Sequence, residues 1–277
     1  MARVTRFAPS PTGPLHLGHA YAALVAAARG DRFLLRIEDI DRARVKPEWE
    51  TAIYDDLAWL GLAWERPVMR QSDRLPAHAA ALDRLQAMGL TYRCTCTRGD
   101  IRAALSAPQE GAPVIGPDGP VYPGTCRSKG HTAGALRLDM IRAMDRLGEV
   151  AFHDTGIRPG PSRQDVAAII AGIGDIVLAR RDIGTSYHLA VVVDDAAQGI
   201  TEVTRGEDLF EATAIHVVLQ RLLGLPTPAY HHHRLIRDSA GRRLAKRDDA
   251  RALAKYRADG ATPADIRQMV GLSPAAR

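Results

Sequence analysis

The chain has 277 residues, of which 46% are hydrophobic and 25% charged, as in an ordinary soluble globular protein. Its formal net charge is +5, its three cysteines argue against a disulfide framework, and no run approaches the ~18 apolar residues of a membrane span. The first ten residues lack the apolar centre of a signal peptide, so we expect a cytoplasmic protein.

The N-terminal residues predict a strand, a loop, a helix and a second strand. The first strand covers residues 3–8, and an alanine-rich helix follows over about residues 18–29, with Gly30 placed to end it. The run "RFLLRIEDID" then reads as the second strand. This order, with a first turn rich in Gly and Pro, predicts a parallel sheet with a crevice at the carboxyl ends of its strands.

The loop "PSPTGPLHLGHA" places His16 and His19 three residues apart as the helix begins. Both side chains would project from one face of the first turn. A helix N-terminus offers free N–H groups and the positive end of the helix dipole, which suits phosphate binding. The alternative is a capped helix start with incidental histidines, and this short stretch does not decide between them.

Two amphipathic helices, "PEWETAIYDDLAWLGL" and "LPAHAAALDRLQAMGL", precede a segment rich in Gly and Pro over about residues 92–129, which looks inserted. After it, "ALRLDM" and "EVAFHD" read as short strands, and residues 175–206 resume the alternation of strands and helices. The helix "LFEATAIHVVLQRLLGL" follows, and one or two short helices end the chain. We predict one α/β domain over residues 1–250, containing this insertion, and a short basic tail over residues 251–277.

The insertion contains Cys94, Cys96 and Cys126. A closed structural zinc site needs four ligands, and the fourth could be Tyr122, His131 or an acidic residue. The alternative is three unrelated buried cysteines. A loop this poor in apolar residues can hardly fold by core burial, so a metal crosslink is favoured.

Other charged groups lie near predicted strand ends. "RIEDID" places Glu38 at one strand end, either as part of a charged terminus or facing the crevice. Arg6 and Arg205 have the planar fork that binds carboxylates. Lys246, in the basic loop "GRRLAKRD", could bind phosphates, although such loops are commonly surface turns. From His231 to the C-terminus there are eleven Lys/Arg against five Asp, which suits nucleic-acid contact or a solvated helical face.

Taken in this order, the motifs resemble the catalytic core of class I aminoacyl-tRNA synthetases. "RFAPSPTGPLHLGHA", "RIEDID", "YHLAVVVDD" and "TEVTRGEDL" resemble its glutamate-specific branch, and the resemblance covers most of residues 3–250. Only 31 residues follow Lys246, whereas glutamyl-tRNA synthetases continue into a long helical anticodon-binding region. The pattern "CTC…YPGTC" is similar to the zinc site of the short glutamyl-queuosine tRNA(Asp) synthetases, whose fourth ligand is a tyrosine at the place of Tyr122.

This resemblance implies an α/β, Rossmann-like class I synthetase catalytic core with a zinc-binding insertion and a short helical C-terminal tail, and no anticodon-binding domain. It implies a role for several residues in binding glutamate: Arg6, Phe7, Ala8, Pro9, Ser10, Glu38, Tyr187 and Arg205. It implies that His16, His19 and Lys246 handle ATP with Mg²⁺ and are catalytic. It implies one structural zinc on Cys94, Cys96, Tyr122 and Cys126, and a monomer that glutamylates the anticodon loop of queuosine-containing tRNA(Asp).

The lysine loop departs from the family pattern K-L-S-K, because Arg243 and Ala245 replace its first lysine and its serine. Two alternatives to the glutamylation of queuosine stay open. One is a truncated glutamyl-tRNA synthetase that charges a tRNA 3′ end. The other is a non-catalytic, zinc-containing RNA-binding module, which the intact "HLGH" and Lys246 disfavour.

Overall fold

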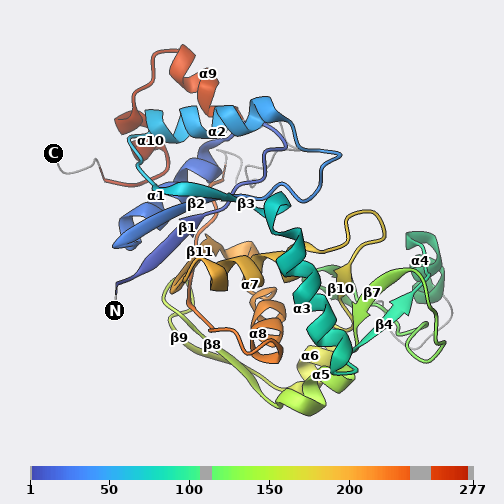
Figure 1. The fold of residues 1–277 in the computed structure, drawn as a ribbon. Helices are drawn as coiled ribbons and strands as arrows, with labels where there is room; N and C mark the ends of the chain where they lie inside the picture. Colours follow the sequence, from blue (N-terminus) through green and yellow to red (C-terminus); the bar gives the residue numbers. More distant parts are fainter. Residues whose placement is uncertain (1, 107–113, 238–250, 274–277) are drawn as a thin grey trace.

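The structure is a computed structural model that describes residues 2–106, 114–237 and 251–273 (Figure 1). Lys246, Arg243 and Ala245 lie outside the described residues. No helix within the described ranges is long and apolar enough to cross a membrane.

The N-terminal part is a three-stranded parallel sheet in the order β1-β2-β3, and its helices lie beside it (Figure 1). Gly30 ends the first helix, as predicted, and the backbone N–H of Gly30 bonds to the carbonyl of Ala26. The elements are β1 (Val4–Phe7), α1 (Leu17–Arg29), β2 (Arg32–Ile37), α2 (Pro47–Trp59), β3 (Glu65–Arg70), the 3₁₀ turn η1 (Gln71–Arg74) and α3 (Leu75–Ala87).

A second sheet has the order β11-β12-β8-β9, in which β11, β12 and β8 run parallel and β9 antiparallel. Val4 of β1 exchanges hydrogen bonds with Thr201, and Arg6 donates to the carbonyl of Thr204. β1 and β11 therefore lie side by side and run in the same direction. The elements are β8 (Val150–Asp154), β9 (Gly160–Gln164), α6 (Val166–Gly172), α7 (Tyr187–Ala197), β11 (Glu202–Gly206), η2 (Glu207–Leu209), α8 (Thr213–Leu222) and β12 (Ala229–His233).

The segment that contains the cysteines lies away from these sheets, at the right of Figure 1. Its antiparallel sheet has the order β10-β7-β4 and is flanked by a small hairpin. The predicted strand "ALRLDM" ends at Leu138, because the side chain of Asp139 accepts from the backbone N–H of Arg142 and caps the next helix. The elements are β4 (Thr91–Cys94), α4 (Arg98–Ser106), β5 (Ile115–Gly116), β6 (Gly119–Pro120), β7 (Ala135–Leu138), α5 (Met140–Leu147) and β10 (Val177–Ala179).

The C-terminal helices α9 (Leu253–Ala258) and α10 (Pro263–Met269) pack beside α1 and α2 (Figure 1). Leu253, Ile266 and Val270 are buried in the same apolar cluster as residues of α1 and α2. Full burial of such a side chain stabilises the fold by about 1.5–3 kcal/mol. The helices α9 and α10 are therefore part of the core beside the N-terminal sheet.

Candidate active site and metal site

The loop after β1 carries the two histidines to the start of α1. His16 is the N-cap residue: its Nδ1 accepts from the backbone N–H of Gly18 at 3.1 Å. The Nδ1 of His19 in turn accepts from the backbone N–H of His16 at 3.2 Å, and the two ring centroids lie 3.8 Å apart. The predicted juxtaposition is present, and the alternative of a helix cap is also correct, because both rings take part in the cap.

Both flanks of the Lys246 segment lie near these histidines. Upstream, β12 ends at His233, whose ring packs edge-on against Tyr21 of α1 with centroids 5.0 Å apart. Downstream, Ala252 pairs with His16 in an isolated antiparallel bridge, and Leu253 donates to the carbonyl of Leu15. The fold therefore brings the two ends of the segment that carries Lys246 to the start of α1.

Buried charges join β1, β2 and α7. Nε and Nη2 of Arg6 donate to the two carboxylate oxygens of Asp195 at 2.9 and 3.3 Å. Arg36, which is fully buried, donates to Asp195 at 2.6 Å and to Glu38 at 3.1 Å. Burial acts to raise the pKa of Asp195, but Arg6 and Arg36 outweigh it and hold that pKa below its usual range. Burial likewise raises the pKa of Glu38, despite its contact with Arg36.

Arg205 differs from Arg6 and Arg36, because its hydrogen-bond partners are neutral. It donates from Nε to His232, from Nη1 to Nδ1 of His216 at 2.9 Å, and from Nη2 to Thr213. Its guanidinium also lies 5.2 Å from the ring centroid of Tyr230. No acidic side chain in the described ranges forms an ion pair with it, and burial lowers its pKa. An arginine has five N–H groups, so two are left for a ligand.

The other predicted glutamate residues surround these arginines. Phe7 and Pro9 are buried, Ala8 is half-buried and Ser10 is exposed, and the carbonyl of Pro9 accepts from the backbone N–H of Glu38. Tyr187 is the first residue of α7 and is 38% exposed, with its ring centroid 5.8 Å from that of His216. The structure therefore brings the loop after β1, the end of β2, the start of α7 and the end of β11 to one place.

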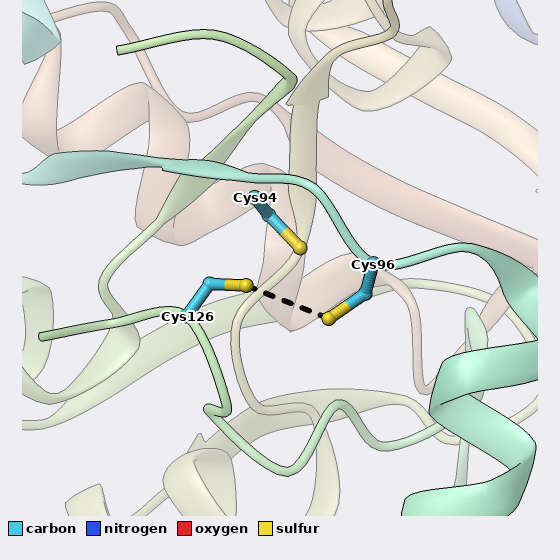
Figure 2. Close-up of side chains that lie close together, drawn as sticks. All are labelled: Cys94, Cys96 and Cys126. Atoms are coloured by element: carbon cyan, nitrogen blue, oxygen red, sulfur yellow. Dashed lines mark hydrogen bonds between the residues drawn. The ribbon is translucent and has the colours of Figure 1, made fainter. Parts of the chain in front are cut away.

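The three thiols of the insertion converge, although Cys94 and Cys126 lie far apart in the sequence (Figure 2). Their sulfur atoms all lie within 4.8 Å of one another, and the Sγ atoms of Cys96 and Cys126 are 3.5 Å apart. Ligands at Zn–S distances of about 2.3 Å in a tetrahedron lie roughly 3.8 Å from one another. The cluster therefore fits a tetrahedral metal ion, with no disulfide between its members.

Tyr122 completes this cluster geometrically. Its hydroxyl lies 3.4 Å from the sulfur of Cys94 and 3.5 Å from that of Cys96, and accepts from the backbone N–H of Cys126. His131 instead contacts Thr95, with 3.4 Å between its Nε2 and the hydroxyl. Burial acts to raise the pKa of Cys126, but hydrogen bonds with Tyr122, the backbone of Thr95 and the other two cysteines together outweigh it and lower that pKa to about 5, which favours a thiolate.

Several buried residues of this site are not among those singled out from the sequence. Asp195 accepts from both Arg6 and Arg36, Arg36 also donates to Glu38, and His216 accepts from Arg205. His232 lies in the "HHH" run, where its Nδ1 is 2.9 Å from Asp154, so this run is a hydrogen-bonded strand. The only signal in the sequence was the presence of charged residues and histidines within otherwise apolar stretches.

A histidine-capped helix and buried arginines gather near the carboxyl ends of parallel strands, and this arrangement is that of a catalytic domain of the class I tRNA synthetase type. Residues 3–274 match the family described as tRNA synthetases class I (E and Q), catalytic domain. The chain belongs to this family, and within it to the branch of the glutamyl-Q tRNA(Asp) synthetases.

The relatives behind this assignment match nearly the whole chain. A glutamyl-Q tRNA(Asp) synthetase of Rhodobacter capsulatus is 62% identical over 290 aligned positions, which cover 97% of this chain and all of that protein. One of Albidiferax ferrireducens is 42% identical, over 90% of this chain and 86% of that protein. The structure of a glutamate tRNA ligase from Elizabethkingia meningosepticum in complex with its amino acid superposes with a TM-score of 0.76 at 27% identity. The match covers 97% of this chain but only 60% of that ligase.

Proposed function

We propose that the chain activates glutamate with ATP, without tRNA, and transfers it to the queuosine base in the anticodon loop of tRNA(Asp). The names of its relatives support this substrate pair. The catalytic unit is residues 1–250, with the insertion at about 92–129, and residues 251–277 form the tail. The protein acts as a monomer in the cytoplasm.

Arg205 is the observation that carries the proposal. A guanidinium that is 7% exposed and held only by neutral partners is costly to bury, unless an anion completes its coordination. A carboxylate matches the two N–H groups that remain. Arg205 therefore binds the side-chain carboxylate of the substrate glutamate, and Tyr187 and Glu38 lie where the α-ammonium group can bind.

In the first step, an oxygen of the glutamate α-carboxylate attacks the α-phosphorus of ATP. The bond from this phosphorus to the bridging oxygen breaks, so pyrophosphate leaves and glutamyl-adenylate forms. His16, His19 and Lys246 would hold the phosphates and stabilise the charge that moves to the leaving group, and Mg²⁺ would supply further positive charge there. The loop from Arg6 to Ser10 aligns the glutamate, because Asp195 fixes the guanidinium of Arg6.

In the second step, a ring hydroxyl of queuosine attacks the acyl carbon of the adenylate. The hydroxyl loses its proton, AMP leaves and an ester forms. An unstacked anticodon loop can bring this base into the crevice, in keeping with the preference of RNA-binding proteins for single-stranded loops. Zinc on Cys94, Cys96, Tyr122 and Cys126 crosslinks the insertion and takes no part in either step.

Glutamate-dependent ATP–pyrophosphate exchange without tRNA tests the first step. The wild type should exchange, and Arg205→Gln should lose exchange with glutamate, whereas Arg32→Gln, in an exposed ion pair with Glu65, should retain it. Absence of exchange by zinc-replete wild-type protein would contradict the proposal and favour a non-catalytic RNA-binding module.

The acceptor test uses queuosine-containing and unmodified tRNA(Asp), with labelled glutamate. We expect label only on the queuosine-containing tRNA, and its retention when the 3′-terminal adenosine of that tRNA has been removed. Label that removal of the 3′-terminal adenosine abolishes would instead identify a truncated glutamyl-tRNA synthetase.

A further inference from the structure

A chain of imidazoles leads from the candidate glutamate pocket to the insertion. Nη1 of Arg205 lies 2.9 Å from Nδ1 of His216 on α8. Nε2 of His216 lies 3.1 Å from Nδ1 of His188 on α7. Nε2 of His188 lies 3.4 Å from a carboxylate oxygen of Asp118. His216 and His188 are 2% and 8% exposed, so solvent contributes little to the hydrogen bonds of these two imidazoles.

The chemistry of arginine determines which nitrogen atom donates in each of these hydrogen bonds. A guanidinium only donates, so Nδ1 of His216 accepts and its proton is on Nε2. That proton is donated to Nδ1 of His188, which leaves the proton of His188 on Nε2, facing Asp118. Burial, followed by the charge of Arg205, lowers the pKa of His216 well below its ordinary value, so the ring stays neutral. A neutral partner orients Arg205 without neutralising it.

Asp118 belongs to the turn of the β5–β6 hairpin, which is docked against the main fold. A Cβ added at Gly116 would lie 2.3 Å from the carbonyl oxygen of Gly172, at the end of α6. A Cβ added at Gly174 would likewise lie 2.6 Å from the side chain of Val121. These close approaches fix the position of the hairpin, and with it the carboxylate of Asp118.

We propose that His216, His188 and Asp118 are positioning residues, which hold the guanidinium of Arg205 in the orientation that binds the substrate carboxylate. The docking of the insertion hairpin is thereby coupled to the affinity for glutamate. This inference rests on the proposed function, in which Arg205 is a glutamate ligand. The deeper partners of Arg205, His232 with Asp154, hold the guanidinium from the other side.

Pyrophosphate exchange kinetics of the full-length, zinc-replete protein test this inference. Asp118→Ala removes a side chain that is 53% exposed and should raise the KM for glutamate by about three- to tenfold. The KM for ATP and kcat should not change. Gly116→Ala, which pushes the hairpin away from α6, should act in the same direction. Asp145→Ala, on an exposed part of α5, is the matched control and should have no effect.

The inner imidazole gives a second, independent comparison. His216→Leu removes the acceptor and should raise the KM for glutamate by at least about tenfold. His216→Asn should restore most of this loss, because its amide oxygen can accept in place of Nδ1. Circular dichroism and thermal unfolding establish that each variant is folded. If His216→Leu does not fold, Asp118→Ala and Gly116→Ala decide the question.

The outcomes separate this inference from the proposed function. Wild-type protein without exchange would refute glutamate activation. An active wild type in which Asp118→Ala and Gly116→Ala keep the KM for glutamate within twofold would overturn the positioning role alone. Equal changes in the KM values for glutamate and ATP would also overturn it, since they would indicate a general structural effect.

Discussion

Replacing Asp195 by Asn tests whether the buried charge cluster stabilises the fold. Asp195 accepts from Arg6 and Arg36 at 2.9 and 2.6 Å, and all three side chains are at most 7% exposed. The substitution keeps the shape but leaves two buried guanidinium groups without their shared carboxylate. Removing one member of a buried ion pair costs about 3–5 kcal/mol.

We expect a loss near the lower end of this range, because Arg36 keeps its bonds to Glu38 and Gln198. A loss of about 3 kcal/mol lowers Tm by roughly 6–12 °C in a protein of this size. Glu65→Gln is the matched control, since Glu65 forms two hydrogen bonds with Arg32 in an exposed pair. That change should leave the Tm almost unchanged, because exposed ion pairs contribute little to stability.

The pH dependence of stability is a second test of the buried charge cluster around Asp195. The pKa of Asp195 is lowered in the folded protein, so its stabilising effect is fully present above its unfolded pKa of about 4. The effect is lost as the pH falls through the lower, folded value. The difference in Tm between wild type and Asp195→Asn should therefore shrink in acid. Equal unfolding free energies for Asp195→Asn and Glu65→Gln at neutral pH would refute this account of the cluster.

Three further changes test other parts of the fold. Cys126→Ser should reduce the zinc content from about one equivalent per chain, as measured by elemental analysis, and the absence of zinc from both proteins would exclude the metal site. Gly156→Ala places a Cβ 2.0 Å from a backbone carbonyl oxygen of β12 and should lower the free energy of unfolding in urea by at least about 1–3 kcal/mol. The control is Gly172→Ala, where an added Cβ meets nothing within 4 Å, and it should leave that free energy unchanged. Equal effects of the two substitutions would contradict the geometry. Leu253→Ala should lower the free energy of unfolding by about 2–5 kcal/mol, whereas Met269→Ala should lower it much less, because Met269 is 49% exposed. If Leu253→Ala leaves the free energy of unfolding unchanged, α9 does not contribute to the core.

Local sequence signals predicted the elements whose ends are marked by residues that terminate helices or strands. The α1 helix starts one residue before its predicted start and ends at Arg29, because the alanine-rich run stops at Gly30. β3 was not predicted, since "ERPVMR" contains a proline and is largely exposed. α5 was partly taken for a strand, because "ALRLDM" is apolar and the capping role of Asp139 depends on the following turn. The α/β class I fold was predicted correctly.

The candidate site was less accessible to sequence reasoning than the fold. The motifs pointed to Arg6, Glu38 and Arg205, but not to the residues that orient them. Asp195 lies 159 residues beyond Arg36 in the sequence, and His216 reaches His188 from another helix. Such pairs depend on which faces of α7 and α8 meet, and that is set by tertiary packing. The assignments to Lys246 and to the zinc ligands stay predictions.

The packing of α9 and α10 into the core has a consequence for truncation. Because α9 and α10 contribute Leu253, Ile266 and Val270 to the core, the tail is an anchor that fixes the backbone downstream of Lys246 beside His16. The described residues on both sides of Lys246 are thus held by the core, through β12 upstream and through α9 and α10 downstream. Because Lys246 is a proposed ATP ligand, removing α9 and α10 should weaken nucleotide binding without deleting any residue of the proposed ATP site.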